Sequence, residues 1–262
     1  MLNCKLSVSV LFALALPWLL PSAEADTAMS DVKWVGALRN VHHGIDYSGH
    51  IDLVNLANLQ HLYAVGPEEG LKGEITIWDS TPLLSEIDGG GKLVINDAFA
   101  RKACFLVYGQ VSDWQAVSIK DAVSDQSISN QVQALARANG VATDKPFVFL
   151  VMGRAKSALF HVLNKIDDLP PDGTTHQHEK AKVKFKLFDQ PVEILGFYSE
   201  HHQGVFTHRD SFVHLHLKTL DSKQAGHLET FELEPGSTVY LPKNQSDSTA
   251  QPFRVAKSSA GF

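Results

Sequence analysis

The feature that most constrains the fold is a period-two alternation of polarity in the C-terminal part of the chain. Residues 211–218 (SFVHLHLK) place His214 and His216 on one side of a strand and apolar residues on the other, because successive side chains of a strand point to opposite faces. A polar turn follows, and alternation resumes at residues 227–233 (HLETFEL). We therefore predict mostly antiparallel strands and turns from residue 181 onward.

If these two strands pair as a hairpin, His227 comes to lie beside His214 and His216. Three imidazoles that leave one position open suit zinc in tetrahedral coordination, and other divalent first-row metals bind such sites as well. In the alternative interpretation, His214 and His216 are half-exposed and hydrogen-bonded to neighbours, and His227 merely ends a turn. The spacing nevertheless favours a metal site, with zinc as the expected ion.

The first half of the chain mixes helical and strand patterns. The predicted helices lie at residues 53–62 and within 118–139, and the predicted strands at 73–80, 92–95, 103–108 and 147–162. A loop with two prolines and a glycine, residues 167–179, is the best candidate for a hinge. We predict an α+β fold of two sheet-rich, closely packed lobes: an N-terminal α/β lobe at 26–166 and a mostly antiparallel, β-rich metal-binding lobe at 167–262.

The N-terminus has the pattern of a signal peptide. Lys5 precedes an apolar run at residues 6–20, and a small-x-small cleavage site follows at residues 23–25. The run is interrupted by Pro17 and is shorter than the ~20 apolar residues that span a bilayer. We expect residues 1–25 to be removed, leaving an exported protein, periplasmic or secreted, without a membrane span. The alternative is a signal anchor that is retained.

Charge and cysteine usage narrow the classes of partner. The formal net charge of −6 argues against nucleic acid, because little would neutralise a row of phosphates. The basic residues between 180 and 186 alternate with apolar ones, which indicates the solvent-facing side of a strand. After signal cleavage Cys104 is the single cysteine, so no internal disulfide can form, and a buried structural thiol is expected. A small-molecule partner is expected; the sequence leaves the oligomeric state, including a homodimer, open.

The remaining histidines carry weaker signals. His42, His43 and His50 are expected in turns, His176 and His178 on the surface of the proline-rich loop, and His201, His202 and His208 either along the cavity or in solvated turns.

Several segments resemble the acetolactate decarboxylases. Residues 212–217 (FVHLHL) and 224–228 (QAGHL) are similar to the zinc-binding segment of that family. Residues 196–199 (GFYS) match the strand that enters it, and residues 71–75 (LKGEI) resemble its Leu-Asp-Gly-Glu-aliphatic motif. These matches are spread over most of the chain that follows the signal peptide.

The resemblance implies a fold and a reaction. The fold would have two associated lobes, with zinc held on the second by His214, His216 and His227, and with Glu74 reaching the metal pocket. The reaction would be the decarboxylation of 2-acetolactate to acetoin, in which zinc is a Lewis acid and a general acid, carried over to Glu74, protonates the product.

Two features depart from the family pattern. His161 or a neighbour occupies the position of the family's arginine, so Arg154, His161 and Arg209 are the candidates for binding the substrate. The family's C-terminal glutamate has no counterpart in residues 251–262. Two alternatives therefore stand beside the decarboxylase: a metalloenzyme of the same fold acting on another small oxygen-rich substrate, and a non-catalytic metal- or ligand-binding protein. A fourth protein ligand on the metal would favour the last.

Overall fold

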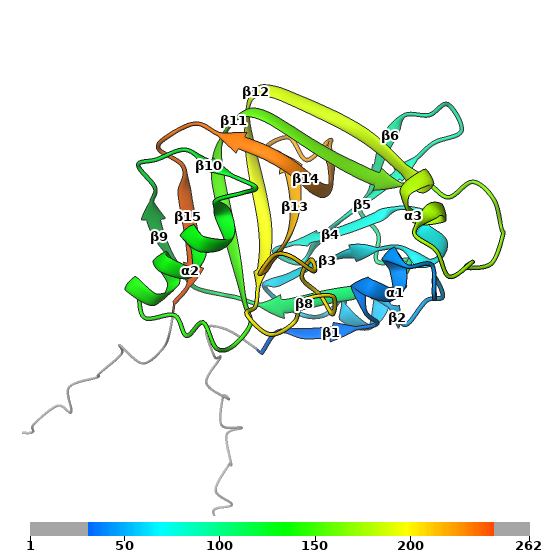
Figure 1. The fold of residues 1–262 in the computed structure, drawn as a ribbon, viewed down its shortest axis with the longest axis horizontal. Coiled ribbons are helices and arrows are strands. Elements are labelled where there is room, and N and C mark those ends of the chain that lie inside the picture. The colour runs from blue at the N-terminus through cyan, green and yellow to red at the C-terminus, as the bar shows by residue number, and fades with distance from the viewer. Residues whose placement is uncertain (1–30, 244–262) are drawn as a thin grey trace, which may run out of the picture.

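The computed structural model describes residues 31–243, in which two antiparallel sheets pack against each other (Figure 1). The predicted signal peptide and the tail without glutamate lie outside the described residues. None of the helices between residues 31 and 243 has the length and apolar character needed to cross a membrane.

The first sheet has six strands in the order β1-β8-β3-β4-β5-β6. Its strands are β1 (Lys33–Val35), β3 (Leu62–Pro67), β4 (Glu74–Trp78), β5 (Thr81–Ile87), β6 (Leu93–Asn96) and β8 (Leu106–Gln110). A small second pairing joins β2 (Ile51–Asp52) to β7 (Lys102–Ala103). The helical segments in this part of the chain are α1 (Leu38–His42) and the 3₁₀ turns η1 (Leu53–Leu56) and η2 (Glu69–Leu71).

The second sheet has seven strands in the order β10-β14-β13-β12-β11-β15-β9. They are β9 (Trp114–Ser118), β10 (Val123–Ser124), β11 (Phe147–Leu163), β12 (Lys182–Tyr198), β13 (Val213–Thr219), β14 (Ala225–Leu233) and β15 (Thr238–Pro242). Because β14 pairs with both β13 and β11, strands β11 to β14 form a closed ring. The helices are α2 (Ile128–Ala138) and α3 (His176–Ala181), and α3 lies beside α1 (Figure 1).

Two apolar layers hold this arrangement together. One fills the inside of the ring and includes Phe149, Phe160 and Leu217. The other lies between the two sheets, where Val65 of β3 and Phe105, which directly precedes β8, meet Leu195 and Phe197 of the second sheet. Alternation along β11 and β12 supplies both layers, since adjacent residues face opposite sides of the sheet. Cys104 is free and buried near the second layer, as its apolar surroundings predict.

The predicted α+β class and the mostly antiparallel sheets are confirmed. The helix predicted at residues 53–62 is wrong: the Asp52 side chain accepts a hydrogen bond from Val54 N and caps only the short turn η1. The chain then passes through His61, with a φ of 53°, into β3. Within the predicted helical region 118–139, only Ile128–Ala138 is α-helical, because Val123 and Ser124 pair with β14 instead.

The predicted boundary between lobes 26–166 and 167–262 lies within the second sheet. It falls between β11 and β12, which pair from Phe147↔Tyr198 to Leu163↔Lys182 within one sheet. The two sheets instead divide the chain between β8 and β9. The proline-rich loop resembled a hinge in the sequence, but it connects the two arms of a long hairpin, and its last part forms α3.

Candidate metal centre

Strand register places the three predicted ligands side by side. His216 on β13 lies directly opposite His227 on β14, and His227 in turn lies opposite His161 on β11. Residues in register on neighbouring strands point to the same face. His214 shares this face because it lies two residues before His216 on the same strand. The predicted hairpin therefore forms, and it delivers all three histidines to the face that packs on the first sheet.

The three rings have the geometry of a metal site. One nitrogen from each of His214, His216 and His227 lies within 4.8 Å of the others, and all three side chains are buried. His214 Nε2 and His227 Nδ1 are 3.1 Å apart. Tetrahedral zinc with bonds of about 2.0–2.1 Å needs nitrogens roughly 3.3 Å apart, which is close to this spacing. Among the described residues, this is the one group of three or more His, Cys, Asp or Glu side chains whose potential ligand atoms lie this close together.

Neighbouring groups orient each ring. His214 Nδ1 donates to the carbonyl oxygen of Phe206 at 2.9 Å, and this contact leaves the Nε2 lone pair free. His216 Nδ1 lies 2.8 Å from the hydroxyl of Thr76 on β4, in the other sheet. His227 Nε2 lies 3.0 Å from His208 Nε2, so its Nδ1 faces the other two ligands. Such outer contacts fix the tautomer and ring orientation of metal-binding histidines.

The protonation states fit a metal as well. Burial is the main cause that lowers the pKa of His214, His216 and His227 well below the ordinary value, so the rings are neutral at neutral pH. Metal binding requires neutral imidazole. His216 Nε2 is buried without a hydrogen-bond partner, which is unusual for a polar atom in a folded protein. A metal ion at this point would satisfy that atom, and the residues present therefore fit zinc.

Glu74 lies against this group. It begins β4 and is buried, with Oε2 3.7 Å from His216 Nε2 and Oε1 3.7 Å from His161 Nε2. A cavity of about 10 Å³ beside it is bordered by His161, His214 and His227, which is roughly the space one water needs. Burial, and then the charge of Glu68, raise the pKa of the Glu74 carboxyl well above its ordinary value. Glu74 thus holds its proton more tightly than an ordinary glutamic acid, and it lies beside this cavity.

A second carboxylate on the other side of His161 has the opposite character. Glu229 Oε1 lies 3.1 Å from His161 Nδ1, and its Oε2 accepts a hydrogen bond from Lys184 at 2.9 Å. The contact with the His161 ring is the largest cause that lowers the pKa of Glu229 to about 2. His161 therefore lies between a carboxyl group whose pKa is raised, Glu74, and one whose pKa is lowered, Glu229.

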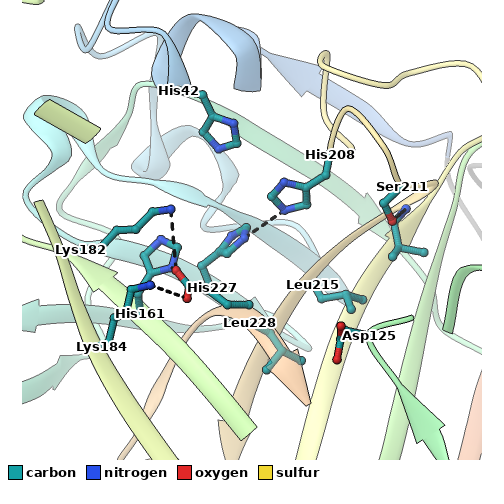
Figure 2. A pocket seen from close by; sticks show the side chains of 12 residues that line it. His42, Asp125, His161, Lys182, Lys184, His208, Ser211, Leu215, His227 and Leu228 are labelled. Atoms are coloured by element: carbon teal, nitrogen blue, oxygen red, sulfur yellow. Dashed lines mark hydrogen bonds and ion pairs between the residues drawn. The ribbon is translucent and has the colours of Figure 1, made fainter. Parts of the chain in front are cut away.

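A larger pocket opens next to His227 (Figure 2). Its volume is about 500 Å³. Basic and histidine side chains border one end, and the other end is bordered by apolar side chains together with Asp125 and Ser211. The lining residues are His42, Asp125, His161, Lys182, Lys184, His208, Ser211, Val213, Leu215, His227, Leu228 and Glu229. His42, His161 and His227 border both this pocket and the small cavity beside Glu74, so the two spaces are neighbours.

The structure brings some of the predicted site residues together and leaves others outside. Glu74 and His161 join the three metal-ligand candidates. Arg154 is half-exposed and paired with Asp189 at 2.8 Å, and Arg209 is exposed; neither borders the pocket. The arginines that the sequence offered for binding a substrate are therefore not at the site.

Three further histidines reach the site, and two of them, His42 and His178, come from elements that the sequence did not connect with it. His42 at the end of α1 packs on His178 of α3, with ring centres 4.6 Å apart, and on His208, at 5.7 Å. His178 is buried, so its predicted surface position is wrong, and His208 lines the pocket, which settles one of the open alternatives. His201 is exposed. The long-range packing of α1 against α3 produces this grouping, and no local pattern signals it.

Comparison with known proteins gives a match at the level of the fold. Neither a family model nor a curated protein sequence matches the chain. A solved structure of alpha-acetolactate decarboxylase from Bacillus subtilis strain 168 superposes with a TM-score of 0.64 at 15% identity, over 82% of this chain and 86% of that one. The enzyme from Bacillus subtilis subspecies spizizenii gives 0.64 and 15%, over 82% and 87%.

A third structure agrees with these two. A Staphylococcus aureus protein of unknown function, described as similar to alpha-acetolactate decarboxylase, superposes with a TM-score of 0.62 at 14% identity, over 82% of this chain and 86% of that one. The fold of this protein is therefore that of the acetolactate decarboxylase structures, and at the face where its sheets meet it has a buried three-histidine group able to hold a metal.

Proposed function

We propose that the protein is a zinc-dependent carbon–carbon lyase that decarboxylates 2-acetolactate, or a close 2-hydroxy-3-keto acid, to acetoin or its homologue. One observation carries the proposal: Glu74, whose pKa is raised by burial, borders the same small cavity as His214 and His227, two of the three neutral, buried histidines. The shared fold with acetolactate decarboxylases supports it.

His214, His216 and His227 would hold the zinc. When bound, zinc would supply Lewis-acid polarisation of the hydroxyl and carbonyl oxygens of the substrate. The remaining chemistry belongs to the residues of the chain. Thr76, the Phe206 carbonyl and His208 keep the rings aligned, so that little reorganisation is needed during reaction.

Glu74 is the proposed general acid. Loss of CO₂ leaves a carbon that must take up a proton, and a carboxyl kept protonated by burial can donate one near neutral pH. His161 Nε2, 3.7 Å from Glu74 Oε1, borders the same cavity and helps to position that carboxyl. The opposed environments of Glu74 and Glu229 favour Glu74 over Glu229 as the acid.

The geometry argues against the non-catalytic alternative. Within residues 31–243 the group of potential ligands consists of three histidines, and no fourth His, Cys, Asp or Glu places a ligand atom equally close to all three. An open position next to an acid is typical of catalytic rather than structural zinc.

The test is release of acetoin and CO₂ from racemic 2-acetolactate by the protein lacking residues 1–25, zinc-loaded and chelator-stripped in parallel. We expect release from the zinc-loaded form alone. No release from protein shown to contain one zinc per chain would reject acetolactate as substrate. Turnover of another small hydroxy-keto acid by that protein would then support the alternative of a metalloenzyme with the same fold and a different substrate.

We also propose that the protein acts outside the cytoplasm, on the strength of the N-terminal sequence pattern. N-terminal sequencing of the native protein should begin at Asp26; a chain that still begins at Met1 in the cytoplasmic fraction would reject export.

A further inference from the structure

The basic residues between 180 and 186 were predicted to lie on the solvent-facing side of a strand, but not all of them do. Lys182 and Lys184 border the pocket beside His227, whereas Lys186, two residues further along β12, is exposed and outside it. The alternation that suggested a solvated strand face is present, but the packing of α1 and α3 over this end of the sheet turns part of that face into a pocket wall. Two lysines are therefore available to the site where the predicted arginines are not.

Lys182 is the more enclosed of the two. Its side chain is 14% exposed, against 49% for Lys184. Burial is the largest cause that lowers the pKa of His42, His161, His178 and His208, and in all four the nearby ammonium of Lys182 lowers the pKa further. Lys182 borders the same pocket as His42, His161 and His208 (Figure 2).

The ammonium groups of Lys182 and Lys184 differ in their carboxylate partners. Lys184 donates to Glu229 at 2.9 Å, and Glu229 also contacts His161. Lys182 donates to Glu179 on α3 at 2.8 Å, whereas its distance to Glu229 is 3.7 Å, beyond a hydrogen bond. An ammonium has three donors. Lys182 therefore keeps donors for a ligand in the pocket, and Glu229 is already paired.

The two ends of the pocket differ in charge. Lys182, His161 and His42 border one end, and His227 lies in the middle; the other end is bordered by Leu215 and Leu228 together with Ser211 and Asp125 (Figure 2). An anionic group of a ligand held near His227 is stabilised at the first end, and a hydrocarbon substituent at the second.

We propose that Lys182 binds the carboxylate of the substrate and so orients it across the metal site, an inference that rests on the proposed function for the identity of the acid. Lys182 is a specificity-determining residue of this chain. It supplies the positive charge for binding the substrate that the sequence analysis sought in Arg154 and Arg209. Lys186 serves as the matched control, since it shares the strand and the side of the strand but not the pocket.

The experiment measures binding, without turnover. The probe is 2,3-dihydroxy-2-methylbutanoate, which keeps the chelating oxygens but has no keto group to assist decarboxylation, compared with its uncharged primary amide. Dissociation constants are determined calorimetrically on the zinc-loaded protein and on Lys182→Met, Lys182→Arg and Lys186→Met. Zinc content and thermal stability are measured in each variant, so that a folding defect is recognised.

We expect Lys182→Met to reduce the preference for acid over amide by about tenfold or more, the usual worth of a hydrogen bond to a charged group. Lys182→Arg and Lys186→Met should keep the preference of the wild type. Equal preferences in Lys182→Met and Lys186→Met would overturn the proposal, even if acetoin is released. Conversely, a lost preference in Lys182→Met would support the carboxylate site even if acetolactate is not turned over.

Discussion

At the scale of single residues, two carboxyl groups that flank the same histidine have pKa values shifted in opposite directions. Glu74 is buried and its pKa is raised, whereas the contact with His161 and the hydrogen bond from Lys184 hold the pKa of Glu229 low. Separate roles for paired carboxyl groups arise in this way in acid–base catalysis. The proton needed after decarboxylation is therefore expected to come from Glu74.

Glu74→Gln should leave zinc content unchanged and reduce turnover of 2-acetolactate by a factor of order 10²–10⁴, as expected for loss of a general acid. Metal content by mass spectrometry and acetoin release at saturating substrate measure the two effects. Glu69→Gln provides the control, because Glu69 lies before the same strand but outside the cavity. Turnover of Glu74→Gln at the wild-type rate would remove Glu74 from the mechanism.

The buried carboxyl group of Glu68 should make the free energy of unfolding depend on pH. Burial is the largest cause that raises its pKa to about 7 from an ordinary 4.5. The folded protein therefore binds a proton more tightly than the unfolded chain, and stability falls as pH rises from 4.5 to 7. Glu68→Gln should increase the free energy of unfolding by roughly 2 kcal/mol at pH 8, a discounted value for such a shift, with little effect at pH 4. Urea unfolding at both pH values checks this; equal effects at both would contradict it.

The sequence predicted the metal ligands because their signal is local. His214 and His216 share a face through the two-residue period of a strand, and His227 follows one turn later. Glu74 and His161 came from the family resemblance, since Glu74 approaches the ligands through the packing of the two sheets and His161 through the long-range pairing of β11 with β14. His42, His178 and Lys182 escaped prediction because tertiary packing alone brings α1, α3 and β12 together.

At the scale of elements, strands were predicted better than helices. The apolar run from Phe147 correctly indicated a long strand, because few polar residues interrupt it. Residues 53–62 had the apolar spacing of a helix. In the structure, however, Leu53 and Leu56 are the buried residues of the short turn η1, and Leu62 already belongs to β3. Periodicity does not reveal which partner strand competes for such a segment.

The long hairpin of β11 and β12 depends on one close approach. Gly196 lies opposite Phe149, and a Cβ atom at Gly196 would overlap the Phe149 ring, which is completely buried and has little room to move. Gly196→Ala should therefore destabilise the protein by about 1–3 kcal/mol through overpacking. Gly89→Ala is the control, since nothing lies within 4 Å of the added Cβ. Denaturant unfolding of both variants decides the matter; similar stabilities would show that the Phe149 ring yields easily.

At the scale of the whole molecule, the candidate metal centre is also a place where the two sheets meet. Thr76 of the first sheet contacts His216 of the second at 2.8 Å, and the Ser85 hydroxyl donates to the Ala225 carbonyl at 2.7 Å. Glu74 reaches His161 from the same side. A metal held at this junction would stabilise the association of the sheets as well as the hairpin that supplies the ligands.

Zinc should therefore raise thermal stability. A ligand that binds only the folded state at about a thousand times its Kd contributes about 4 kcal/mol, which corresponds to a rise in Tm of roughly 10 °C for a chain of this size. Calorimetry of zinc-loaded and chelator-stripped protein measures the rise. His214→Ala and His216→Ala should lose both the metal and the rise, because two remaining imidazoles bind zinc weakly, whereas His176→Ala, an exposed histidine of α3, should keep both. A variant lacking His214 or His216 that still retains one zinc per chain and the full rise would place the metal elsewhere in the protein and separate its stability from this junction.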